Sequence, residues 1–543
     1  MTPTQRFFKL LSGFKKEVTY LYFYALVAGL VSLSLPLGMQ AIVQFVMAGQ
    51  LSTSLTLLVV MVVLGIAISG YLQIMQLRLA EYIQMQIFAR GAFEFSFRIP
   101  RIKLESLQGI YPPEFINRFF DVPQIQKGLA KVLIDFSIAS LQVIFGLLLL
   151  SIYHPLFIAL SAALILSLYL LFRVTGKKGM ESSLMESKYK YKTAYWLQEI
   201  ARAITTFKVS DETGLAHKRL DKEVTGYLQA RKSHFSVLMT QYTAMVVLKT
   251  LIAAFLLGVG IFLVIDRQIN IGQFVAAEII ILTVLSGVEK LLLSMDTIYD
   301  LLTSLSKVGD VTDMPLDEEG GFGLTEEQCA RGIEIQIENL SFTYADQNKP
   351  TLKDLHLHIG AGEKVALVSG TMGGKTTLLK LLAGFYGNYS GLIKMNKLRL
   401  EDIDRRTLHR WVSECISTET IFHGSIYDNI VMGRDIDKNY VLRVMDDLGL
   451  TRLVDLLPEG LHTYMLPEGK QFSKKLVNRI IMARAIVRTP GLILYEDLMA
   501  TLPLADRETI NKMLVSGSWT LIAVTNDENL IAKCDRVIRF EGL

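Results

Sequence analysis

The sequence predicts a protein of two parts, an α-helical domain with six transmembrane spans followed by an α/β domain. Two observations support this fold class: apolar residues concentrate in roughly the first 300 positions, and short apolar, strand-like runs appear beyond residue 332. The chain has 543 residues, too many for one domain, and 51% of them are apolar while 20% are charged. This composition excludes a disordered protein.

Charge and cysteine content exclude two further classes of protein. A net charge of +4 over the whole chain gives no sign of a dense basic patch, so no nucleic-acid partner is expected. The three cysteines show no metal-like spacing, which excludes a disulfide scaffold and favours reduced thiols.

Six spans are expected in three hairpins. Residues 18–77 contain no Asp, Glu, Lys or Arg. A span takes about 20 residues, so this run holds two spans, with a turn near residues 49–52 and a kink at Pro36. The uncharged run 136–172 holds two more around His154-Pro155. The last two spans, 237–265 and 271–293, flank a polar turn.

The distribution of positive charge predicts the orientation. Residues 173–232 carry 13 Lys and Arg, whereas the short turns on the opposite side carry one, Arg267. Positive residues stay inside, so both termini and the long loops are expected to be cytosolic. Residues 1–17 predict an interfacial elbow helix that contacts membrane lipid; the alternative is the frayed start of the first span. The transmembrane domain is expected over 18–308, with helices that extend into the cytosol.

An acidic, Gly-rich linker is expected over 309–332, followed by an α/β domain over 333–543. Residues 333–340 alternate as a strand does, and the apolar runs 365–368 and 492–495 are typical of buried parallel strands.

A phosphate-binding loop is predicted between one of these strands and a helix. In LVSGTMGGKTT (367–377), Gly374, Lys375 and Thr376 match the end of the pattern G-x-x-x-x-G-K-[ST], and Ser369 replaces the first Gly. Such a loop places a nucleotide phosphate on the helix N-terminus, with Lys375 on the β/γ oxygens. The alternative is an accidental GGKTT.

With six spans before this loop, the chain resembles the ATP-binding-cassette exporters over essentially its whole length, most closely the bacterial peptide and type I exporters. The resemblance implies a six-span transmembrane exporter domain followed by an α/β P-loop NTPase cassette. It also implies ATP and Mg²⁺ as ligands, and a place in the bacterial cytoplasmic (inner) membrane.

The family's ATP-binding positions carry over residue by residue. Tyr344 occupies the position of the aromatic residue that stacks on adenine, and Thr418 (or Ser417) that of a Gln. The remaining nucleotide positions are Ser369, Gly370, Thr371, Met372, Gly373, Gly374, Lys375, Thr376 and Thr377. Thr376 and Glu496 are the implied Mg²⁺ ligands, and a side chain at Met372 is expected to crowd the phosphates.

The family's hydrolytic positions are altered. The Asp-Glu pair is reversed to Glu496-Asp497, the switch His is Asn526, and the Asp of the dimer-contact loop is Pro503. The signature L-S-G-G-Q has become Phe472, Ser473, Lys474, Lys475 and Leu476. Asp497 is one methylene shorter than Glu, so its carboxylate is expected to fall about 1.5 Å short, and such misplacement can cost around 10²-fold in rate.

These changes predict a half-size exporter subunit with little or no hydrolysis of its own, the impaired member of a heteromeric transporter for a peptide, protein or other amphipathic substrate. Its partner would be a half-transporter with intact motifs, or a second copy of itself, with a membrane-fusion adaptor as a further possible partner. Two alternatives stay open: an active homodimeric exporter with divergent motifs, and a regulatory or scaffold protein that transports nothing.

Two groups of residues are expected to link the cassette to transport. The coupling residues, expected by resemblance in the cytosolic loops, are Pro113, Phe115, Arg118, Trp196 and Glu199; the alternative for them is ordinary helix packing. The polar residues expected along the membrane pathway are Gln40, Gln44, Lys249, Glu278 and Glu289. Lys249 and Glu289 lie at similar depth, so they are expected to pair, either for structure or along the substrate path.

Overall fold

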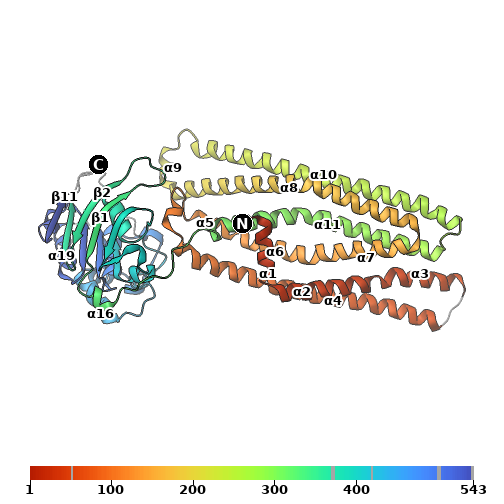
Figure 1. Ribbon diagram of the computed structural model, residues 1–543, viewed down its shortest axis with the longest axis horizontal. Helices are drawn as coiled ribbons and strands as arrows, with labels where there is room; N and C mark the ends of the chain where they lie inside the picture. The colour runs from red at the N-terminus through yellow and green to blue at the C-terminus, as the bar shows by residue number, and fades with distance from the viewer. Residues whose placement is uncertain (50–52, 369–373, 417–419, 498–502, 540–543) are drawn as a thin grey trace. The chain divides into compact units, whose positions relative to one another are not determined.

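The computed structural model describes residues 1–49, 53–368, 374–416, 420–497 and 503–539. The chain divides into two compact units. The helical unit comprises Met1–Pro100 and Tyr111–Met314, and the α/β unit comprises Arg101–Ile110 and Pro315–Leu543 (Figure 1). The α/β unit therefore includes a ten-residue segment that interrupts the helical unit in sequence.

The described part of the helical unit contains six helical stretches long and apolar enough to cross a membrane, as predicted. They are α2–α3 (Lys15–Ser32, Ser34–Met47), α4 (Thr53–Arg98), α5–α7 (Glu114–Phe119, Asp121–Lys131, Ser137–Tyr153), α8 (Pro155–Arg202), α10 (Leu215–Ile265) and α11 (Ile271–Thr312). Short helices α1 (Pro3–Ser12) and α9 (Ile204–Ser210) complete the unit. The chain is thus an integral membrane protein.

The predicted breaks between helices are present. Pro36 lacks the N–H that would bond to Ser32, and α2 ends at Ser32. His154 separates α7 from α8, and its Nδ1 accepts a hydrogen bond from the N–H of Leu156 at 3.2 Å. Asn270 begins α11 by accepting a hydrogen bond from the N–H of Gln273 at 2.8 Å. The expected turn at 49–52 lies partly outside the described residues.

Helix α11 carries the core of the helical unit, with half of its most apolar window buried. It packs against α7, α10, α6 and α3, while α8 and α10 run side by side along their length (Figure 1). The predicted boundary at residue 308 and linker from 309 are wrong at their start, because α11 continues to Thr312. Its last turn stays helical because the Arg6 guanidinium of α1 pairs with Asp313 at 2.8 Å.

The α/β unit is built on two larger sheets. The antiparallel sheet has the order β2-β1-β4-β5 (Leu352–Ile359, Ile335–Phe342, Ser390–Met395, Leu398–Arg399). The parallel sheet has the order β11-β3-β10-β9-β6 (Arg536–Arg539, Lys364–Val368, Thr520–Val524, Leu492–Glu496, Val412–Cys415). The strands predicted near 333–340, 365–368 and 492–495 are therefore β1, β3 and β9.

Helices cover the faces of the parallel sheet and bury its continuous apolar runs. The main ones are α13 (Lys375–Leu382), α14 (Arg405–Trp411), α15 (Ile426–Val431), α16 (Lys438–Asp447), α18 (Lys474–Ile486) and α19 (Leu504–Ser516). Shorter elements are α12 (Glu326–Cys329), α17 (Thr451–Val454), α20 (Glu528–Ile531) and the two-stranded sheet β7-β8 (Gly424–Ser425, Tyr464–Met465).

Two glycines of α8 provide a matched test of this packing. A Cβ at Gly179 would lie 2.4 Å from the ring of buried Tyr299, whereas a Cβ at Gly176 would meet nothing within 4 Å. Gly179→Ala is expected to lower the free energy of unfolding by about 1–3 kcal/mol through overpacking. Gly176→Ala is expected to be neutral or to stabilise by up to about 1 kcal/mol. Thermal unfolding of the solubilised chain measures both; equal midpoints for the two variants would contradict this packing.

Candidate functional site

The predicted nucleotide residues follow three neighbouring strands of the parallel sheet. Val524 of β10 is paired with Leu367 of β3 on one side and with Glu496 of β9 on the other. Because all three strands are parallel, their carboxyl ends meet at one edge of the sheet. The phosphate loop, Asp497 and Asn526 leave the sheet at that edge, so the register of three strands builds the site.

The described part of the phosphate loop is the start of α13. Gly374 has φ +69° at the helix N-cap, and a Cβ there would lie 2.7 Å from the carbonyl oxygen of Thr351, so only glycine fits. Lys375, Thr376 and Thr377 form the first turn, where backbone N–H groups are available to an anion. Ser369, Gly370, Thr371, Met372 and Gly373 lie outside the described residues, as do Ser417 and Thr418.

The two predicted metal ligands are in contact. The Thr376 hydroxyl donates a hydrogen bond to Glu496 Oε1 at 2.5 Å. A hydroxyl and a carboxylate are the hard oxygen ligands that Mg²⁺ prefers when it also binds phosphate. The residues present therefore fit a magnesium ion at the mouth of the phosphate loop, with Glu496 in the role that the family gives to Asp.

Hydrogen bonds connect both the backbone and the side chain of Asp497 to the carboxyl end of β10. Its N–H donates to the carbonyl of Val524 at 3.0 Å, and its Oδ2 accepts from the Thr525 hydroxyl at 3.2 Å. Burial raises the pKa of Asp497, while the Thr525 hydroxyl and the backbone N–H of Asn526 oppose that shift. The Asp497 carboxylate is thus hydrogen-bonded to Thr525, the residue directly after β10. The next residue, Asn526, is exposed.

Tyr344 lies beside the phosphate-loop helix, where adenine stacking was predicted. Its hydroxyl is 3.0 Å from that of Thr377, and its ring stands edge-to-face on Phe342 and Tyr386, with centroid distances of 4.9 and 5.6 Å. The structure therefore ties the predicted base-stacking residue to the helix that begins at Lys375.

The signature segment Phe472–Leu476 begins α18. Ser473 caps this helix by accepting a hydrogen bond from the N–H of Leu476 at 3.4 Å, and Leu476 is buried. Lys475 Nζ lies 2.5 Å from Asp506 Oδ2, and Arg479 lies 2.6 Å from the other oxygen. Lys475 and Arg479 hold the pKa of Asp506 below its usual value. The positive charge of Lys475 is therefore neutralised within its own subunit.

The predicted coupling residues lie in the helical unit. Phe115 of α5 is 5% exposed and follows Pro113, the residue that precedes the helix. Arg118 pairs with Glu114 at 3.0 Å and stacks on the ring of Tyr191. Trp196 donates to the carbonyl of Ala216 at 2.9 Å, and Glu199 pairs with Arg202 at 2.7 Å. Their coupling role stays a prediction.

Sequence reasoning missed the segment that joins the α/β unit, Arg101–Ile110. The Glu105 carboxylate accepts hydrogen bonds from the backbone N–H groups of Gly387 and Asn388. Gln108 Oε1 accepts from the N–H of Ala345 at 3.2 Å, directly after Tyr344. In the sequence, the only available signal was the acidic residue Glu105 in the loop after α4. Its contact with Gly387 joins residues 282 positions apart, so no local sequence pattern reveals it.

The predicted pair in the membrane is present. Lys249 Nζ of α10 lies 3.2 Å from Glu289 Oε2 of α11. Gln40 accepts a hydrogen bond from the Tyr153 hydroxyl at 2.6 Å, whereas Gln44 and Glu278 are exposed on the described chain. Of the five predicted pathway residues, the structure brings Lys249 and Glu289 together. That any of the five lines a substrate path stays a prediction.

Comparison with known proteins finds matching family models and a solved structure of the same fold. A family model for the ABC transporter transmembrane region matches residues 18–288, and the ABC transporter model matches 352–499. The solved structure of a bacterial Atm1-family ABC exporter with ATP bound superposes with a TM-score of 0.84 at 16% identity, covering 97% of this chain and 93% of that one. The fold of both units is therefore shared.

The curated relatives that match in sequence include two bacterial translocation and secretion proteins. The alpha-hemolysin translocation ATP-binding protein of Escherichia coli O157:H7 is 24% identical over 346 residues, 63% of this chain and 49% of the relative. The colicin V secretion/processing ATP-binding protein of Escherichia coli is 23% identical over 545 residues, 97% of this chain and 75% of the relative. The chain thus spans about half the length of the first relative.

Asp506→Asn tests the ion pairs behind the signature segment. It leaves Arg479, a side chain 5% exposed, without its carboxylate, and is expected to cost about 3–5 kcal/mol of stability. Because the pKa of Asp506 is lowered, the pairs stabilise the fold at neutral pH, and this contribution is lost only as the pH falls below about 4. Thermal unfolding at pH 7 measures the loss. Glu508→Gln, on the exposed side of α19, is the control; an equal loss in both variants would contradict the assignment.

Proposed function

The chain belongs to the ABC transporter family, and on that premise we propose that it is a half-size exporter subunit whose nucleotide site binds ATP but hydrolyses it poorly. It would serve as the impaired member of a heteromeric transporter. The proposal rests on two contacts in the nucleotide site, one that suits metal binding and one that does not suit hydrolysis. The contact between Thr376 and Glu496 is in place for a metal, whereas the Asp497 carboxylate is bound to Thr525.

Nucleotide binding is supported by the groups that hold phosphate and base. Lys375 and Thr376 occupy the first turn of α13 after a glycine with positive φ, and the Thr376 hydroxyl lies against the Glu496 carboxylate. Tyr344 is fixed beside the same helix through Thr377. Mg²⁺, when bound between Thr376 and Glu496, would neutralise charge on the phosphates.

Poor hydrolysis is supported by the positions that would act on the attacking water and on the γ-phosphate. A general base must lie within hydrogen-bond reach of its water, and Asp497 is shorter than Glu and already accepts a hydrogen bond from Thr525. Asn526 cannot accept and release a proton as His does. Lys475, in place of a signature Gly, is held by Asp506 and adds bulk where family members have only backbone.

A partner with intact motifs would restore part of this chemistry. By family resemblance, cassettes pair head to tail, and each site joins one chain's phosphate loop to the other chain's signature. A heteromer would then contain one site with the partner's loop and catalytic groups facing this chain's Phe472–Leu476. The other site would combine Lys375, Thr376 and Asp497 with an intact signature. We therefore assign residual turnover to the first site and static ATP binding to the second.

The substrate class follows from the relatives' names and from the membrane unit. Proteins described as translocating haemolysin and secreting colicin V match this chain, so a polypeptide or another amphipathic substrate is the best-supported cargo. Positive charge in residues 173–232 supports cytosolic termini in a bacterial inner membrane, and secretion across a double envelope would add a membrane-fusion adaptor.

ATP binding is tested by substitutions in α13. Lys375→Ala is expected to raise the Kd for ATP at least 10-fold, because it removes the charge that faces the phosphates. Lys380→Ala, near the other end of the helix, is the control and should leave Kd unchanged. Fluorescence titration with a nucleotide analogue measures both. Equal affinity in the two variants would contradict a nucleotide site at this loop.

Hydrolysis is tested by restoring the family's residues. The purified chain is expected to show negligible ATPase activity, and the combined variant Asp497→Glu, Asn526→His, Lys474→Gly and Lys475→Gly is expected to gain about 10²-fold. Adding Lys375→Ala to that variant should abolish the gain. Robust turnover by the unaltered chain, abolished by Lys375→Ala, would instead favour the active homodimer.

A further inference from the structure

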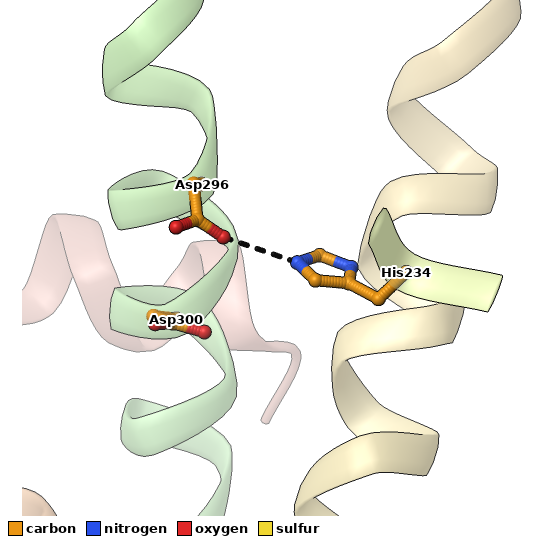
Figure 2. Close-up of side chains that lie close together, drawn as sticks. All are labelled: His234, Asp296 and Asp300. Carbon is orange, nitrogen blue, oxygen red and sulfur yellow. Dashed lines mark hydrogen bonds and ion pairs between the residues drawn. The ribbon is translucent and has the colours of Figure 1, made fainter. Parts of the chain in front are cut away.

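A cluster of one histidine and two carboxylates lies between α10 and α11 of the helical unit, which contains none of the predicted nucleotide residues. His234 belongs to α10, and Asp296 and Asp300 lie one turn apart on the same face of α11 (Figure 2). One ligand atom from each of the three side chains lies within 4.8 Å of the other two. His234 is fully buried, whereas the Asp296 side chain is 44% exposed, so the cluster is open on the Asp296 side.

A hydrogen bond from outside the cluster favours one tautomer of the His234 ring. The hydroxyl of Ser182, on α8, donates to the carbonyl of Gly179 at 2.9 Å. The same oxygen lies 2.8 Å from His234 Nδ1. A hydroxyl has one hydrogen, and with that hydrogen on the Gly179 carbonyl, Ser182 accepts a hydrogen bond from Nδ1–H. In the neutral ring, the lone pair therefore sits on Nε2.

Figure 2 shows where Nε2 points: it faces Asp296 Oδ1, at 3.2 Å. In this tautomer a lone pair faces a carboxylate oxygen, and a cation between the two relieves their repulsion. An imidazole whose other N–H is held by a protein oxygen is also the usual arrangement of a metal-ligating histidine.

Charge balance in this cluster favours a divalent metal ion over a single proton. One proton on Nε2 would compensate Asp296 and leave the negative charge of Asp300, which accepts a hydrogen bond from Gln124 Nε2 at only 3.4 Å. Among the nearby cations, Arg231 pairs with Glu186 at 3.2 Å and Lys190 with Asp121 at 3.4 Å. Lys131 also acts on Asp296, but in the described part of the chain it forms no ion pair with that carboxylate. A divalent cation compensates both carboxylates at once.

We propose that His234 Nε2, Asp296 and Asp300 bind one divalent transition-metal ion, with zinc as the best match to one imidazole nitrogen and two carboxylate oxygens. Water would complete the coordination on the open Asp296 side. Asp296 lies about 38 Å along α11 from Ile271, at 1.5 Å per residue, which is beyond an apolar bilayer core of about 30 Å. The ion would enter from the aqueous side and join α10 to α11, with Ser182 holding the ring from α8.

The test uses the full, tag-free chain in detergent, stripped with a chelator and equilibrated with micromolar Zn²⁺. Metal content measured by mass spectrometry after dialysis is expected to show one Zn²⁺ lost from Asp296→Asn and from Asp300→Asn. Ser182→Ala, which frees the ring, is expected to weaken affinity 10- to 100-fold. Zn²⁺ should raise the thermal midpoint of the unaltered chain but not that of the Asp variants.

Asp221→Asn, an exposed carboxylate on α10, is the matched control and should bind as the unaltered chain does. Co²⁺ is a second probe, and its visible spectrum reports nitrogen and oxygen ligands without any measurement of transport. Equal zinc content in the control and in Asp300→Asn would mean an adventitious ion only and would overturn the proposal. A chain that binds no zinc at micromolar concentration would also overturn it.

Discussion

The parallel register of β3, β10 and β9 is the constraint on which the nucleotide site depends. Pairing of Val524 with both Leu367 and Glu496 sets the carboxyl ends of the three strands at one level. The Asp497–Thr525 contact joins residues that follow the neighbouring strands β9 and β10, and the Thr376–Glu496 contact joins the helix after β3 to the end of β9, on the two sides of β10, so both depend on that register. A shift of one residue in β9 would turn Glu496 to the other face of the sheet. The sheet therefore preserves the position of the site even where the side chains at that position have changed.

Polar contacts between α8, α10 and α11 fix the helical unit in a similar way. The Lys249–Glu289 pair, the amide of Gln241 on Tyr299 and Thr175, and the imidazole of His234 lie about two turns apart from one another along α10. Buried polar groups are costly unless they are satisfied, so each contact specifies how the helices align. Packing of apolar side chains along α11 buries most of the surface between these helices. The polar contacts then select one alignment of α8, α10 and α11 among several that would bury a similar apolar area.

Much of this architecture could be predicted, because its signals are local. Uncharged runs predict the spans, His154-Pro155 and the polar turn before Ile271 predict the breaks, and the depths of Lys249 and Glu289 predict their pair. The roles of Thr376 and Glu496 came from motif resemblance. By contrast, the contacts of Glu105 with Gly387 and of His234 with Asp296 span 282 and 62 residues and depend on tertiary packing. The end of α11 was predicted too early, because its last turn depends on Arg6 from the other end of the chain.

We propose that this chain holds ATP with residues of the phosphate loop but does not close a productive site with a second copy of itself. Electron cryomicroscopy of the purified chain with ATP and Mg²⁺ tests it most directly. We expect nucleotide on Lys375, with the metal between Thr376 and Glu496, in cassettes that remain apart. A closed pair of copies, with the γ-phosphate of each clamped against the Phe472–Leu476 segment of the other and a water aligned on Asp497, would contradict it.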